Sequence, residues 1–320
     1  MSDIDHALRA AVSESVTKIR GKRPRNPLNK RLGFIGNQLQ RWESGARQPS
    51  WPDFIQLCEV CQVPVARALD ASLQFSGNPR NPANILTHLL GQSKLNVFSK
   101  TVGETSSTIS KWKSGKAVPT FLQMLTVIER GQGLAVHFLD ALFAEDPLQA
   151  LDKIRQERKR LREPLASMPE SSGLLAILSL KKSFTKEDAQ ASATTLGIEA
   201  KRFSEIFTRL EEAGWIERNG EDYHLSAFRL DARGDLEVNR ALRQHWLSES
   251  RKILDTAQSL RHPHRFGVLL ITLSEETDRQ IEELYQNFFG SLKQIVDSDK
   301  GAKNCLRVIS VQDILVNKNI

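Results

Sequence analysis

Apolar residues recur at helical spacing through much of the chain, and turn-forming residues divide these runs into short segments. In residues 98–113, one helical run stops at Gly103, and the next begins after Thr105 or Ser106 and continues to Lys113. Glycine adopts the positive φ with which helices commonly end, and a hydroxyl side chain is suited to cap the helix that follows. Two short helices joined by a few residues that include glycine form a helix–turn–helix pattern.

The same pattern occurs twice along the chain, at a constant separation of 70 residues and without a gap. A fixed period over nearly sixty residues indicates one structural unit used twice in succession. We expect a first unit over residues 8–72 and a second over residues 80–145, with a short, stiff connection over residues 72–82. The matching segments are Trp42-Glu43-Ser44-Gly45 with Pro49, and Trp112-Lys113-Ser114-Gly115 with Pro119.

Both copies resemble the Xre/Cro type of helix–turn–helix domain, the lambda-repressor-like type. That family's pattern is an apolar-rich helix, a glycine, a short polar helix, then Trp-Glu-x-Gly and a later proline. Residues 28–33 and 42–45 and Pro49 match it, and the second copy departs from it at Lys113, where the family prefers glutamate. The resemblance covers roughly residues 8–145 and implies double-stranded DNA binding through the second helix of each pair.

The expected base-contacting residues lie on these recognition helices. In the first copy, Asn37, Gln38 and Arg41 lie opposite Leu39 and Trp42. Asn and Gln bond adenine bidentately and Arg bonds guanine, whereas hydroxyl groups form single bonds that discriminate bases poorly. The expected base-contacting residues of the second copy are Ser106, Ser107, Thr108 and Lys111. We assign Trp42 and its equivalent Trp112 to the core of each unit and not to base stacking.

Positive charge is concentrated in the same region. Residues 1–145 hold 18 Lys and Arg against 11 Asp and Glu, whereas residues 146–320 hold 27 of each. Segregated positive charge attracts DNA phosphates, and its coincidence with the repeat favours this interpretation over a merely solvated basic surface. The expected phosphate-contacting residues are Arg20, Lys22, Arg23, Arg25, Asn29, Lys30, Arg47, Lys100, Lys113 and Lys116.

Two further parts are predicted between the repeat and residue 228. Residues 146–168 contain a connecting helix that begins at Leu148 and ends near Pro164, and residues 168–173 form a linker. In residues 170–228, three helices precede a hairpin with the turn Asn219-Gly220, an order that resembles a winged helix. The acidic residues of this part favour protein contact over DNA contact. They are Glu199, Glu205, Glu211, Glu212, Glu217, Glu221 and Asp222.

Residues 235–320 are predicted to form a small α/β unit. A helix over residues 235–260 precedes a strand at 265–273, a broad apolar helix that includes residues 281–296, and a second strand at 305–311. The arrangement resembles an uncharacterised C-terminal domain that some bacterial helix–turn–helix regulators carry. Dimerisation, binding of a ligand and contact with a protein partner are open alternatives for this part.

Metal, cofactor and enzyme functions find little support in the sequence. Cys58 and Cys61 form a CxxC without a second Cys pair or a nearby His, and Cys58 matches Ile128 in the repeat, so we expect it in the core. His262 and His264 lie in a predicted turn without accompanying carboxylates or cysteines. The common phosphate-loop, nucleophile and zinc-hydrolase motifs are absent from the sequence, so we expect no catalytic residues, no metal and no cofactor.

The sequence thus predicts a mainly α protein with two tandem helix–turn–helix bundles, a winged-helix-like unit and a small C-terminal α/β unit. We expect a bacterial, cytoplasmic transcriptional regulator, because no apolar stretch suits a membrane helix and the N-terminus does not resemble a signal peptide. The alternative is a protein-interaction adaptor or antitoxin-like module in which the repeats are structural. On DNA, either both heads of one chain cover a composite site, or each chain uses one head and a homodimer forms through residues 281–296.

Overall fold

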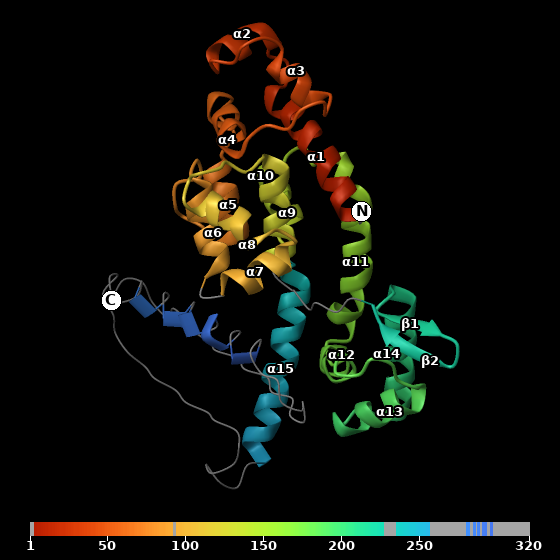
Figure 1. Ribbon diagram of the computed structural model, residues 1–320. Coiled ribbons are helices and arrows are strands. Elements are labelled where there is room, and N and C mark those ends of the chain that lie inside the picture. The colour runs from red at the N-terminus through yellow and green to blue at the C-terminus, as the bar shows by residue number, and fades with distance from the viewer. Residues whose placement is uncertain are drawn as a thin grey trace, which may run out of the picture. The chain divides into compact units, whose positions relative to one another are not determined.

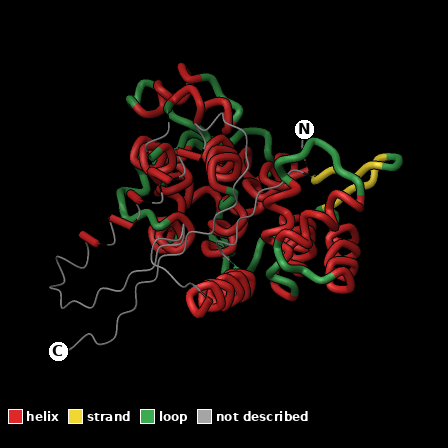
Figure 2. The backbone as a smooth tube through the Cα atoms, turned by 90° about the horizontal axis from the view of Figure 1, so that it is seen from below, coloured by secondary structure: helices red, strands yellow, loops and turns green. Residues whose placement is uncertain are grey.

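The computed structural model of the protein describes residues 3–91, 94–226, 235–256 and part of the positions between 280 and 296. The described residues are mainly helical, as predicted, with one two-stranded antiparallel hairpin (Figure 2). None of the helices described is both long enough and apolar enough to cross a membrane. The predicted strands at 265–273 and 305–311 lie outside the described residues.

Each copy of the repeat folds into five helices, and the two sets match one another at the separation of 70 residues. The first set comprises α1 (Asp3–Arg20), α2 (Arg25–Arg31), α3 (Gln38–Glu43), α4 (Trp51–Val60) and α5 (Val65–Leu73). The second set comprises α6 (Pro82–Leu90), α7 (Leu95–Val102), α8 (Ser106–Lys113), α9 (Phe121–Gln132) and α10 (Ala135–Leu142). In Figure 1, α2 and α3 lie at one end of this pair of bundles, and α7 and α8 lie toward the other.

The predicted turn chemistry between these helices is confirmed. Gly33 and Gly103 follow α2 and α7 with φ of 73° and 74°, in the left-handed region that glycine adopts without steric cost. Thr105 caps α8, because its Oγ1 accepts a hydrogen bond of 3.0 Å from the backbone N–H of Thr108. The turn therefore ends one helix and starts the next through local interactions alone.

The core of the repeats contains the residues that the pattern assigned to it. Trp42 is 0 % exposed and Trp112 is 3 % exposed, which confirms that both indoles pack inside their bundles. Cys58 and its equivalent Ile128 are also fully buried. Burial raises the pKa of the Cys58 thiol well above its ordinary value, so this cysteine behaves as a small apolar side chain.

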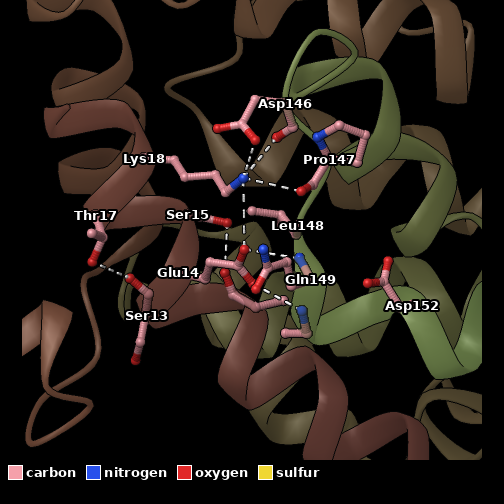
Figure 3. Close-up of polar contacts among 12 residues, drawn as sticks. Ser13, Glu14, Ser15, Thr17, Lys18, Asp146, Pro147, Leu148, Gln149 and Asp152 are labelled. Carbon is pink, nitrogen blue, oxygen red and sulfur yellow. Dashed lines mark hydrogen bonds and ion pairs between the residues drawn. The ribbon is translucent and has the colours of Figure 1, made fainter.

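Helix α1 also contacts the second repeat and the segment that follows it. It has 18 residues, whereas its counterpart α6 has 9. The Glu14 carboxylate accepts hydrogen bonds from the backbone N–H groups of Gln149 and Ala150, at 2.8 and 2.9 Å (Figure 3). Lys18 Nζ donates to the carbonyl oxygens of Asp146 and Pro147, at 3.1 and 3.0 Å. These contacts fix the start of the chain against residues about 130 positions later.

The chain divides into two compact units, and the boundary between Arg158 and Lys159 falls inside one helix. That helix, α11 (Asp152–Ser167), follows the short 3₁₀ helix η1 (Gln149–Leu151). It continues past Pro164, whereas the sequence predicted an end there. Only one helical hydrogen bond is lost at a proline, and the backbone N–H of Met168 still bonds the carbonyl of Pro164 at 2.9 Å.

The second unit packs four helices, the hairpin and the end of α11 around its own apolar core. Residues 171–173, predicted as linker, instead begin α12, where Gly173 packs closely against Trp246. The predicted hairpin is present, but its two-residue turn is Gly220–Glu221, one residue later than expected, because Asn219 pairs with Asp222. The elements are α12 (Ser171–Leu178), α13 (Lys186–Thr195), α14 (Ala200–Ala213), β1 (Ile216–Asn219), β2 (Asp222–Leu225) and α15 (Leu236–Thr256).

Candidate nucleic-acid interface

Helix α3 buries its apolar residues and exposes part of its polar face. Leu39 and Trp42 are fully buried against the bundle. Asn37 and Arg41 are exposed, and Gln38 is half-buried. Their side chains form no hydrogen bond or ion pair with any residue that the structure describes. Asn37, the N-cap residue of α3, and Arg41 therefore present an amide and a guanidinium group to solvent with their donors and acceptors unused.

Asn29, predicted to contact phosphate, lies inside the bundle. Its side chain is 4 % exposed, and its Oδ1 accepts a hydrogen bond of 3.2 Å from the backbone N–H of Leu39. This N–H belongs to the first turn of α3, which has no acceptor within its own helix. Asn29 thus holds α3 against α2, a positioning role that its polar character alone did not reveal.

The second repeat uses hydroxyl groups at the same place. Ser99, the equivalent of Asn29, is 3 % exposed, and its Oγ lies 2.8 Å from the Oγ of Ser106. Thr108 Oγ1 lies 2.8 Å from the Oγ1 of Thr105. Of the four expected base-contacting residues here, Ser106 and Thr108 are thus engaged locally, and Ser107 and Lys111 are exposed.

Glu43 explains why the two copies differ at the position after the tryptophan. Its side chain is only 7 % exposed and forms ion pairs with Arg20 of α1 and Arg25 of α2. The equivalents in the second repeat are Lys113, Leu90 and Leu95, so all three members of this ion-pair cluster are replaced together. Arg20 and Arg25 therefore have an intramolecular role in the free protein, in addition to the phosphate contact predicted for them.

The other predicted phosphate-contacting residues fall into two groups. Arg23 donates hydrogen bonds to the carbonyl oxygens of Arg20 and Cys61, at 3.3 Å each. The remaining side chains are exposed or half-buried and form no ion pair within the described part of the chain. They are Lys22, Lys30, Arg47, Lys100, Lys113 and Lys116. These six cations are available to a polyanion without first breaking an internal ion pair.

Ile35 is a candidate contact that the sequence did not suggest. It lies in the turn between α2 and α3, two residues before Asn37, and is 95 % exposed. The left-handed conformation of Gly36, with φ of 71°, follows it in this turn. An apolar side chain at this position is suited to contact the 5-methyl group of thymine. A lone isoleucine next to a glycine carries no signal in a pattern search, because its exposure depends on the turn geometry.

Comparisons of the chain with protein-family models, with curated proteins and with solved structures each gave no match.

Proposed function

We propose that the chain is a sequence-specific double-stranded DNA-binding protein, acting as a cytoplasmic transcriptional regulator. The α2–α3 and α7–α8 pairs are its helix–turn–helix motifs, and α3 and α8 are its recognition helices. One observation carries the proposal: α3 buries Leu39 and Trp42 and leaves Asn37 and Arg41 exposed and unengaged among the described residues. A helix that served only the core would gain nothing from this pair of unused bidentate groups.

The groups available on α3 match the edges of bases in the major groove. Arg41 can donate two hydrogen bonds to O6 and N7 of guanine, and Asn37 or Gln38 can bond N6 and N7 of adenine. The exposed cations of both repeats contribute sequence-independent attraction to phosphates. In the second repeat, Lys111 can still bond guanine, but the hydroxyl groups discriminate bases poorly. We therefore expect this head to read fewer bases than the first and to add affinity through its exposed lysines.

The second unit supports a role in protein contact. Phe184 and Tyr223 exchange backbone hydrogen bonds of 2.9 and 2.8 Å. Residue 184 thus forms an isolated antiparallel bridge with the second strand of the hairpin. This arrangement of three helices and a hairpin is that of a winged-helix-like unit. The acidic side chains of the hairpin, Glu217, Glu221 and Asp222, are exposed and outnumber its one Lys or Arg residue, Arg218. This negative charge disfavours approach of DNA phosphates.

Retention on DNA separates the regulator from an adaptor whose repeats are only structural. The full chain is passed over duplex genomic fragments, and the retained fragments are sequenced at increasing salt. We expect a common sequence among them and an affinity that falls steeply with salt. An adaptor would show neither.

Variants of α3 then test the assignment of the site. Arg41→Ala is expected to weaken specific binding by about 5- to 150-fold and to relax the preference at one base pair, corresponding to about 1–3 kcal/mol. Arg67→Ala, on α5, removes the same charge from an exposed position of the same repeat and is the matched control. If Asn37→Ala, Gln38→Ala and Arg41→Ala together leave the preferred sequence unchanged, α3 is not the recognition helix.

A further inference from the structure

The two repeats meet through a pair of reciprocal backbone hydrogen bonds. The N–H of Trp51 donates to the carbonyl of Pro119, and the N–H of Phe121 donates to the carbonyl of Pro49, both at 2.9 Å. The two bonds are equivalent. The donors, at positions 51 and 121, are 70 residues apart, and so are the acceptors, at positions 49 and 119. Between them, Ser50 and Thr120 form an antiparallel bridge, and these residues are again equivalent.

Reciprocal contacts of this kind identify the relation between the repeats. A two-fold rotation brings equivalent residues together and makes every contact occur twice, as in a symmetric dimer. A translation along the chain would instead join two different surfaces, and each contact would occur once. The repeats are therefore arranged head to head, although they follow one another head to tail in the sequence.

The centre of the interface has the same symmetry and is apolar, whereas the contacts that α1 makes with α9 have no counterpart and include an ion pair between Asp5 and Arg130. Helices α5 and α10, which are equivalent, pack against each other, and Figure 1 shows them side by side between the two recognition helices. Trp51 lies at the centre, with its ring centroid 5.8 Å from that of Phe121 and 6.2 Å from that of Phe138. All three rings are fully buried. This surface is buried within a single chain, as a permanent interface would be.

The connection between the repeats is also fixed in place. The indole N–H of Trp51 donates to the carbonyl of Pro79 at 2.7 Å, and Arg80 forms an ion pair with Glu59 of α4. Phe75 is 6 % exposed and packs against His88 of α6. The segment that joins the two heads thus contacts both of them, which limits any change in their relative orientation.

The symmetry also limits how far apart the recognition helices lie. A two-fold rotation leaves the position along its axis unchanged, so α3 and α8 lie at the same height along that axis. Six Cα–Cα steps separate Glu43 from Pro49 and Lys113 from Pro119, a path of at most about 22 Å. The C-terminal ends of α3 and α8 therefore lie within about 50 Å of each other. One helical turn of DNA, about 34–36 Å, fits this limit.

We propose that one chain binds one complete DNA site, and that this site is an imperfect inverted repeat with half-site centres about one helical turn apart. The inference rests on the proposed function and adds orientation, spacing and stoichiometry to it. A two-fold arrangement of recognition helices matches inverted half-sites, whereas a head-to-tail arrangement would match direct repeats. The repeat is imperfect because Asn37, Gln38 and Arg41 of α3 are replaced by Ser107, Thr108 and Lys111 in α8.

The test uses the full chain and a duplex selected by it from a random library. Three synthetic duplexes of equal length and composition then carry the selected site, the same two halves in direct orientation, and the first half with the second scrambled. We expect the inverted site to bind at least about 10-fold more tightly than either alternative, with one chain per duplex in native mass spectrometry. Three results would overturn the inference while the DNA-binding function stands. They are tighter binding to the direct repeat, equal binding to the duplex with the scrambled second half, and two chains on the minimal site. If no duplex is retained at any salt concentration, the proposed function itself fails.

A variant that equalises the two heads gives a second, independent readout. Ser107→Asn, Thr108→Gln and Lys111→Arg together give α8 the base-contacting side chains of α3. Selection with this variant should converge on a perfect inverted repeat of the half-site that α3 prefers. Ser204→Asn with Thr208→Gln, at exposed positions of α14, is the control and should leave the selected site unchanged. Convergence of the α8 variant on a direct repeat of that half-site would contradict the two-fold arrangement.

Discussion

Replacing Trp51 by alanine tests whether the contact between the repeats holds the first unit together. The indole is fully buried, donates its N–H to the carbonyl of Pro79 at 2.7 Å, and contacts aromatic rings from both repeats. Truncation of a buried tryptophan to alanine costs about 3–5 kcal/mol, because apolar burial is lost and a cavity remains. For a unit of this size, each kcal/mol corresponds to about 2–4 °C in Tm, so we expect a decrease of about 6–20 °C.

Trp51→Phe is the matched variant, because phenylalanine occupies the equivalent position, Phe121, in the second repeat. It keeps most of the apolar contact and loses the hydrogen bond to Pro79, for which we expect a cost of about 1–2 kcal/mol. Scanning calorimetry measures both variants, and hydrogen-exchange mass spectrometry identifies which unit melts in each transition. Phe203→Ala, at a site 1 % exposed in the second unit, should lower only the other transition. If Trp51→Ala melts within about 2 °C of the wild type, the interface between the repeats does not stabilise the unit as we infer.

Three further predictions concern the recognition helix and the buried thiol. Trp42→Ala is expected to lower Tm by several degrees, for a loss of about 3–5 kcal/mol, before it changes the preferred DNA sequence; unchanged Tm with lost DNA binding would place the indole at the DNA surface instead. Asn29→Ala should destabilise the first unit by about 1–2 kcal/mol in urea unfolding, because it leaves the Leu39 N–H without its acceptor, whereas Asn29→Asp keeps that acceptor and should cost less. Burial raises the pKa of the Cys58 thiol, so the unfolded chain loses this proton first as the pH rises past the ordinary value of about 8.5. The stability advantage of the wild type over Cys58→Ala should therefore shrink above about pH 9 and be constant below about pH 7.5; a constant difference across this range would mean that the thiol titrates alike in both states.

Local features were well predicted from the sequence, because neighbouring residues determine them. Gly103 ends α7 and Thr105 caps α8 through contacts within a few positions, and Cys58 is buried as its repeat equivalent Ile128 implied. The errors are also local. Helix α11 passes Pro164, and the hairpin turn is displaced by one residue, since tertiary packing and strand register decide such details.

Features that depend on the arrangement in space could not be predicted. A repeat in sequence does not distinguish a head-to-head from a head-to-tail arrangement, because both give the same separation of 70 residues. The hydrogen bond from the Leu39 N–H to Asn29, and the contacts of Glu14 with the start of η1, join residues whose types are ordinary at those positions.

The interface between the repeats has a consequence for how binding would respond to protein concentration. Some regulators must dimerise before they bind DNA. On dilution they lose occupancy of the site in two ways, because the protein dimer dissociates as well as the protein–DNA complex. Here the bridge at Ser50 and Thr120 joins parts of a single polypeptide, so dilution cannot separate the two heads. At low concentration, the occupancy of a DNA site would be proportional to the number of protein molecules, down to a few molecules per cell. A graded change in expression would then give a graded change in occupancy.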